Sequence, residues 1–145
     1  MKKLMLILVT LFTIHSVVMA DNDVPVPLNQ LPQQAQQFIK THFTKSEISY
    51  GKMEKEWFQK NYDVIFTNGD KVEFDKNGNW KEIDCKHNIL PTAIVPKAIL
   101  DYVTQNHPNT KIKKIERDRN SYEIELTNGL ELKFNKQFKA IRIER

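Results

Sequence analysis

Residues that could bind a metal or act as a nucleophile are few in this sequence. Cys85 is the only cysteine, and His87 follows it two positions later. A zinc site needs three or four ligands held together, and neither His42 nor His107 stands at ligand spacing from this pair. The two-residue spacing of Cys85 and His87 in a strand also does not place an imidazole base against a thiolate. We therefore predict no metal and no cofactor, and interpret Cys85 as a small apolar residue near a strand end; a free thiol or an intermolecular bridge are the alternatives.

The run from Asp75 to Asn79 (DKNGN) has the oxygen-bearing side chains of a calcium loop but not its spacing. An EF-hand loop has glycine at its sixth position and a bidentate glutamate at its twelfth, whereas here Gly78 is fourth and Lys86 is twelfth. We interpret this run as a hairpin turn. The sequence also lacks G-x-S-x-G, H-E-x-x-H and a glycine-rich phosphate loop. It therefore predicts no catalytic residue and a protein that is not an enzyme.

Aromatic and apolar side chains expected on the outside of a sheet are the better functional candidates. The predicted partner-binding residues are Trp57, Phe58, Trp80, Tyr50 and Ile65. Exposed clusters of Trp and Tyr anchor many protein interfaces. The alternative is that Trp57 and Phe58 fold back over the core while Trp80 covers a strand edge, and the sequence leaves both open. Charged residues expected on the same face of the second half would form a rim: Glu123, Glu125, Arg142 and Glu144.

The element that positions these residues is a stretch that the chain contains twice. Residues 62–74 read YDVIFTNGDKVEF and residues 122–134 read YEIELTNGLELKF. In both, apolar and polar residues alternate on either side of an Asn-Gly pair. Alternation places every second side chain on one face of a strand, and Asn-Gly suits the positive φ of a tight hairpin turn. Each copy therefore predicts a β-hairpin with one apolar face.

A short amphipathic helix is predicted before each hairpin. The first follows Leu31-Pro32, with apolar residues at helical spacing, and the second follows Val95-Pro96 in the same way. A strand is expected between each helix and its hairpin, and a last strand after it. The first half carries four extra residues, in an expected connection over residues 54–61 that holds Trp57 and Phe58.

These elements predict an α+β fold in which two α-β-β-β repeats form one antiparallel sheet with helices packed on one face. One unit of about 55 residues buries too little surface to be stable alone, so the two should share a sheet. The predicted organisation is a signal peptide over residues 1–20, an extended lead-in over 21–30, repeat 1 over 31–85, a linker over 86–94 and repeat 2 over 95–145.

The first twenty residues have the order of a secretory signal peptide. Lys2 and Lys3 precede an apolar run, and Val18-Met19-Ala20 places small residues before a cut after Ala20. The alternative, a membrane anchor, is disfavoured because the run contains His15 and Ser16. We predict a periplasmic or secreted protein without membrane insertion after cleavage. Loss of two lysines and no acid lowers the net charge from +4 to +2, and the interleaved charges do not predict nucleic-acid binding.

The chain resembles the PepSY-like domains of exported bacterial proteins, over nearly all of the residues that follow the predicted signal peptide. The matching residues are Leu31-Pro32, Tyr62, Asn68-Gly69, Phe74-Asp75, Gly78, Trp80 and Ile83, then Val95-Pro96, Tyr122, Asn128-Gly129, Phe134 and Ile143. The second copy departs at Asn135–Phe138, which lacks the Asp and Gly, so a different turn shape is expected there. Tandem proteins of this kind resemble the β-lactamase inhibitor protein fold, which implies helices behind a sheet whose concave face grips a partner.

Two functional hypotheses follow. The first is an exported binding or inhibitor-like module, monomeric or weakly dimeric, whose open sheet face binds an envelope protein. The second is a periplasmic small-ligand binder or envelope sensor, with a pocket between the sheet and the inserted connection. A flat, wide aromatic surface would favour the first, and a concave pocket with convergent polar groups would favour the second.

Overall fold

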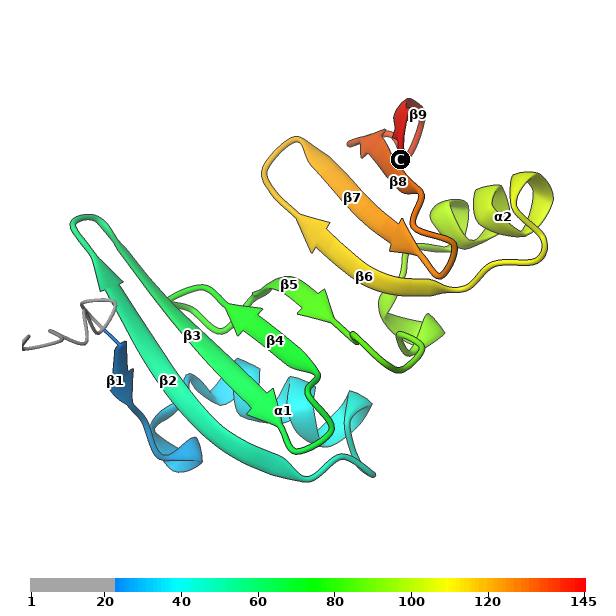
Figure 1. Cartoon of the computed structure of the whole chain (residues 1–145). Helices are drawn as coiled ribbons and strands as arrows, with labels where there is room; N and C mark the ends of the chain where they lie inside the picture. Colours follow the sequence, from blue (N-terminus) through cyan, green and yellow to red (C-terminus); the bar gives the residue numbers. More distant parts are fainter. Residues whose placement is uncertain (1–22) are drawn as a thin grey trace, which may run out of the picture.

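The computed structural model describes residues 23–145, so the predicted signal peptide and its cleavage site lie outside the described residues. These residues form a nine-stranded antiparallel sheet in which the strands follow one another in chain order. Two α-helices and two short 3₁₀ segments complete the structure (Figure 1). The elements are β1 (Asp23–Pro25), η1 (Leu28–Gln30), α1 (Gln33–His42), β2 (Ile48–Glu56), β3 (Gln59–Phe66), β4 (Lys71–Phe74), β5 (Trp80–Asp84), η2 (Thr92–Ile94), α2 (Lys97–Asn106), β6 (Ile112–Arg117), β7 (Ser121–Leu126), β8 (Glu131–Asn135) and β9 (Ala140–Glu144).

The predicted fold class is confirmed, with one difference in the strand count. In each half a helix is followed by four strands, β2–β5 after α1 and β6–β9 after α2. These are the strand, the hairpin and the last strand expected for each repeat, which the α-β-β-β description counted as three. The halves join because β5 pairs with β6, with Ile83 opposite Ile115. The expected lead-in also contributes, since β1 pairs with β2 at the edge of the sheet.

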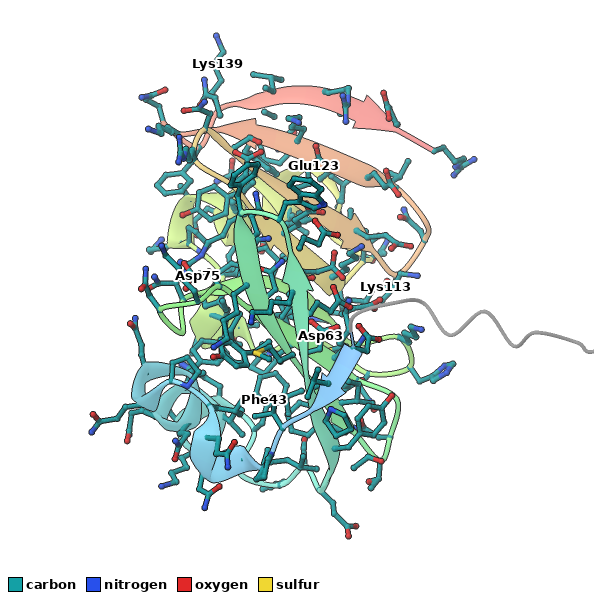
Figure 2. The ribbon with its side chains drawn as sticks, turned by 90° about the vertical axis from the view of Figure 1, so that its left-hand side faces the viewer. Phe43, Asp63, Asp75, Lys113, Glu123 and Lys139 are labelled. Atoms are coloured by element: carbon teal, nitrogen blue, oxygen red, sulfur yellow. The ribbon has the colours of Figure 1, made fainter. Side chains whose placement is uncertain are left out.

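One face of the sheet carries a continuous apolar core. Pairing places Val64, Val72, Ile83, Ile115, Ile124 and Leu132 side by side across six strands, and each is buried. Both helices pack on this face. Phe38 of α1 meets Phe74 edge-on with ring centroids 5.7 Å apart, and Tyr102 of α2 meets Phe134 likewise at 5.3 Å. Phe43, which follows α1 and is labelled in Figure 2, stacks on Phe66 at 4.9 Å.

The expected difference between the last turns of the two halves is wrong. In the first half, Asp75 Oδ1 accepts the backbone N–H groups of Asn77 and Asn79. In the second half, Asn135 Oδ1 accepts the corresponding groups of Gln137 and Lys139. Phe138 adopts φ +60°, where Gly78 has φ +88°. An amide oxygen replaces a carboxylate, and the phenylalanine tolerates the left-handed conformation, so the turn keeps its shape.

Residues 54–61, expected to be a connection, extend the hairpin instead. Their backbones pair as Glu54 with Asn61, Lys55 with Lys60 and Glu56 with Gln59. The four extra residues therefore lengthen β2 and β3, and Trp57-Phe58 form the tip. In Figure 1 this hairpin reaches beyond the shorter β4 and β5.

Candidate functional site

The turns after β2, β4 and β6 lie at one end of the sheet, because consecutive antiparallel strands reverse direction at every turn. Together they enclose an open cleft of about 540 Å³. The cleft is lined by Phe58, Gln59, Lys60, Asn61, Asp75, Lys76, Asn77, Asn79, Trp80, Lys81, Arg117, Asp118 and Arg119. It therefore combines two aromatic side chains with five cationic and two acidic ones.

Trp57 and Phe58 are the most exposed aromatic residues of the described chain. Their side chains are 96% and 94% exposed, and their ring centroids lie 6.4 Å apart. The alternative in which they fold back over the core is therefore wrong. Phe58 also lines the cleft, so the exposed tip and the cleft form one continuous surface.

Trp80 was expected to face outward as an anchor, and this expectation is wrong. A bulge in the β4–β5 pairing sets Trp80 opposite Phe74, and the residue is only 7% exposed. The Arg117 guanidinium covers its ring, with Cζ 3.9 Å from the ring centroid. Arg117 Nε also donates a hydrogen bond of 2.7 Å to the Trp80 carbonyl oxygen. Trp80 thus forms a buried wall of the cleft beneath an arginine.

Tyr50 and Ile65 lie on the open face but away from Trp57 and Phe58. They are direct cross-strand partners, and Tyr50 is 53% exposed. Tyr50 and Trp57 are seven positions apart along the hairpin, which corresponds to roughly 20 Å at about 3.3 Å per residue. The predicted surface is therefore divided into a tip with a cleft at one end and a Tyr50–Ile65 pair at the other.

Most cations of the cleft have no acidic partner within residues 23–145. Lys81 pairs with Glu73 at 3.2 Å, whereas no ion pair involves Lys60, Lys76, Arg117 or Arg119 in the described chain. Lys60 instead lies over the Tyr62 ring at 5.2 Å. Burial lowers the pKa of Arg117, although Tyr122 and the Asp75 carboxylate act to raise it, as expected for a guanidinium partly removed from water.

The two carboxylates of the cleft are occupied by their own turns. Asp75 accepts three hydrogen bonds, two from backbone N–H groups and one from the Asn79 side chain at 3.1 Å. Burial acts to raise its pKa, but these bonds lower it. Asp118 accepts the N–H groups of Asn120 and Ser121, and the Asn120 bond is the main cause of its lowered pKa. Both groups are ionised at neutral pH, yet their lone pairs serve the turns.

The open face beyond the cleft is charged rather than aromatic. Cross-strand pairing sets five acids in one row across β3–β7: Asp63, Glu73, Glu82, Glu116 and Glu123. Asp63 and Glu123, the two ends of the row, are labelled in Figure 2. Lysines in and beside the row compensate it through ion pairs of Lys71, Lys81, Lys114 and Lys133. The open face therefore carries a network of ion pairs, and it is not the flat, wide aromatic surface that would have favoured the partner-binding hypothesis.

Asp63 is the least well compensated acid of this row. It is 3% exposed, and its Oδ1 atom has no hydrogen-bond partner within residues 23–145. Lys52 Nζ lies 3.4 Å from Oδ2 but also contacts Asp23 at 2.8 Å and Glu54 at 2.7 Å. Burial raises the pKa of Asp63 even though Lys71 and Lys52 act to lower it. The carboxylate therefore opposes folding when it is ionised.

The remaining candidates are placed as follows. Cys85 is buried, as expected, and burial raises the pKa of its thiol to about 12, whereas His87 is exposed. No group of three or more His, Cys, Asp or Glu side chains within residues 23–145 is arranged to hold a metal ion. None of the helices described is both long and apolar enough to cross a bilayer.

The cations of the cleft are not evident as a cluster from the sequence. Arg117 and Arg119 flank Asp118 in a polar run at the end of β6, and this clustering of charge was the available signal. Their meeting with Phe58 and Trp80 depends on the pairing of β5 with β6, which joins the halves. No local pattern in the chain shows that juxtaposition.

Comparison with known proteins agrees with this architecture. The profile of the beta-lactamase-inhibitor-like, PepSY-like family matches residues 18–57 and 60–142. A comparison with curated proteins gave no match.

Three solved structures are similar over most of the chain, and each is described as a periplasmic protein. One, from Bacteroides vulgatus ATCC 8482 and assigned to the DUF2874 family, is 55% identical with a TM-score of 0.84, and the match covers 88% of this chain and 100% of that one. The second, from Bacteroides thetaiotaomicron and described as calcium-regulated, is 54% identical with a TM-score of 0.86 and the same coverage. The third, also from Bacteroides vulgatus ATCC 8482 and of unknown function, is 38% identical with a TM-score of 0.80, covering 85% and 99%. The chain therefore belongs to the beta-lactamase-inhibitor-like, PepSY-like family.

Proposed function

We propose that this protein is an exported, non-enzymatic module that binds a protein partner of the cell envelope through the tip formed by Trp57 and Phe58. The observation that carries the proposal is the nearly complete exposure of two adjacent aromatic side chains, at 96% and 94%. Large aromatic residues dominate the energetics of protein interfaces because they bury much apolar area in a single contact.

The tip is also held in a defined position, which favours binding. Residues 54–61 pair across the hairpin up to Glu56 and Gln59, so the aromatic pair projects from regular strands rather than from a long loop. Binding then orders few additional backbone residues, which reduces the entropic cost of association. The charged open face behind the tip would supply a polar rim.

The comparisons support the compartment, and the description of the family indicates a class of partner to test. The similar structures are described as periplasmic proteins, and the family is described as inhibitor-like. An exported enzyme whose active site admits a projecting hairpin is therefore the first partner to test. To test this, the full chain is expressed and the exported protein is recovered from the cell envelope. This protein is then used for affinity capture of partners from envelope extract.

Two double variants separate the tip from the rest of the predicted surface. Trp57→Ala/Phe58→Ala should abolish capture of the partner, whereas Tyr50→Ala/Ile65→Ala, at the far end of the same hairpin, should retain it. Exposed substitutions usually change stability by less than about 0.5 kcal/mol, so the tip variant should unfold like the native protein. Loss of the half-buried Ile65 side chain should make the control the less stable of the two, so its retained capture could not be explained by a more stable fold. A partner captured equally by the native protein and the tip variant would refute the proposal.

A second candidate function is binding of a small anionic ligand. The cleft of about 540 Å³ favours it, because a concave pocket with convergent polar groups is the feature that the small-ligand hypothesis expects. Its volume lies within the range of small-molecule sites, and polar groups converge on two aromatic walls. Thermal-shift screening of small carboxylates and phosphates tests this candidate. A rise in unfolding temperature that is lost in Arg117→Gln would support it, and no response to any anion would exclude it.

A further inference from the structure

We propose that the cleft between the three hairpin turns is a subsite for an acidic segment of the protein partner, whose carboxylates are bound by Arg117, Arg119 and Lys76. This inference rests on the proposed function, because the cleft is continuous with the exposed tip through Phe58. A partner seated on Trp57 and Phe58 would lay its adjacent residues across the cleft.

The charges of the cleft select an anion. Four of its five cations have no ion pair in the described part of the chain, and its two carboxylates are held by backbone N–H groups of their own turns. An excess of positive charge in a concavity attracts and orients anions more strongly than the same charges on a flat surface. The row of five acids on the open face has no comparable excess of charge, because neighbouring lysines neutralise it.

Arg117 gives the cleft its geometric preference for a carboxylate. Its ring contact with Trp80 and the hydrogen bond from Nε to the Trp80 carbonyl fix the plane of the guanidinium. The Tyr122 hydroxyl, on the cross-strand partner of Arg117, and the Asp75 carboxylate both act on the guanidinium. Within residues 23–145, however, no carboxylate forms an ion pair with it. A fixed guanidinium of this kind recognises carboxylates through paired hydrogen bonds.

A peptide segment explains the distribution of the cations better than one small anion. Lys60, Lys76 and the Arg117–Arg119 pair lie at the ends of three different hairpins, so they can meet several carboxylates along an extended chain. Lys76 and Arg119 are exposed, which allows either to follow a ligand that lies across the opening.

The test uses Trp80 as a reporter inside the cleft. The chain contains two tryptophans, so Trp57→Phe leaves Trp80 as the only one while keeping an aromatic tip. Titration with the peptide acetyl-Asp-Glu-Asp-Glu-amide should give a saturable change in Trp80 fluorescence that weakens as salt is added. The isosteric peptide acetyl-Asn-Gln-Asn-Gln-amide should give none, and succinate should bind at least about tenfold more weakly because it spans fewer cations.

Matched charge variants then place the binding in the cleft. Lys76→Gln/Arg119→Gln removes two exposed cations of the cleft, and Lys136→Gln/Lys139→Gln removes two exposed cations at the β8–β9 turn. Both change the net charge equally. The first should weaken binding of the acidic peptide about tenfold, the sum of two modest ion pairs, and the second should leave it within about twofold.

The inference would be overturned by equal weakening in both double variants, by equal binding of the neutral peptide, or by succinate binding as tightly as the acidic peptide. It fails independently of the proposed function. If partner capture requires Trp57 and Phe58 but not Lys76 and Arg119, the tip function stands and the acidic subsite is wrong. If the peptide binds but no partner depends on the tip, the subsite stands and the tip function is wrong.

Discussion

Replacing Gly78 with alanine tests whether the β4–β5 turn is packed directly against the start of α1. Gly78 has φ +88°, and a Cβ atom there would lie 2.8 Å from the Ala35 nitrogen and 2.9 Å from the Pro32 Cβ. Carbon atoms in contact prefer 3.5–4.0 Å, so the turn would have to move from the helix by roughly 1 Å. Overpacking of this kind costs about 1–3 kcal/mol.

Gly129→Ala is the matched control. Gly129 occupies the Asn-Gly turn between β7 and β8 with φ +84°, and a Cβ atom there would meet nothing within 4 Å. It should lose only the left-handed backbone preference of glycine, about 1–2 kcal/mol. Gly78→Ala should lose that amount and the overpacking cost, about 2–5 kcal/mol in total. The effect of alanine on the unfolded chain is similar at both sites and largely cancels in the comparison.

The assay is urea unfolding followed by tryptophan fluorescence, with the free energy of unfolding obtained by linear extrapolation. We expect Gly78→Ala to be less stable than Gly129→Ala by about 1–3 kcal/mol, at an unchanged dependence on urea. Equal stabilities within about 0.5 kcal/mol would show that the turn separates from α1 without cost. That result would refute the close packing between the turn and the helix.

Three further predictions concern buried groups. Because the pKa of Asp63 is raised in the folded state, ionisation of its carboxyl group opposes folding. The stability gain of Asp63→Asn over the native protein, measured by urea unfolding, should therefore grow as pH rises from about 4 toward 7. A gain that is independent of pH would contradict this. The Cys85 thiol, with a pKa of about 12, should not react with a disulfide reagent at pH 8 until the protein is unfolded, when one thiol per chain should appear. Trp80→Ala should destabilise the fold by about 3–5 kcal/mol, whereas Trp57→Ala should change it by less than about 0.5 kcal/mol; similar losses would show that the two residues do not differ in burial as described.

The sequence was sufficient to predict the repeats, the two Asn-Gly hairpins and the helices behind one sheet. These depend on local periodicity, because burial on a single face requires apolar residues at every second position in a strand. Val64, Val72 and Ile83 follow this pattern and are fully buried.

The errors arose where backbone pairing is not accompanied by an apolar pattern. Residues 54–61 form ladder pairs, yet none of them is fully buried, so the alternation of apolar and polar residues that marks a half-buried strand is missing. The bulge that buries Trp80 is set by the pairing of β4 with β5, which shifts the side chain relative to simple alternation. The cleft could not be predicted because it combines turns from both halves.

The two edge strands of the sheet differ in their capacity to pair with a further strand. At one edge, β1 is only three residues long and contains Pro25, features that discourage further pairing. At the other, β9 leaves Ile143 at 53% exposure, although Ile83, its counterpart on β5, is fully buried beside β6. The outer edge of β9 therefore presents backbone groups equivalent to those through which β5 of the first half pairs with β6 of the second. The architecture is extensible in one direction, and a third unit fused after Glu144 would find a docking edge already built.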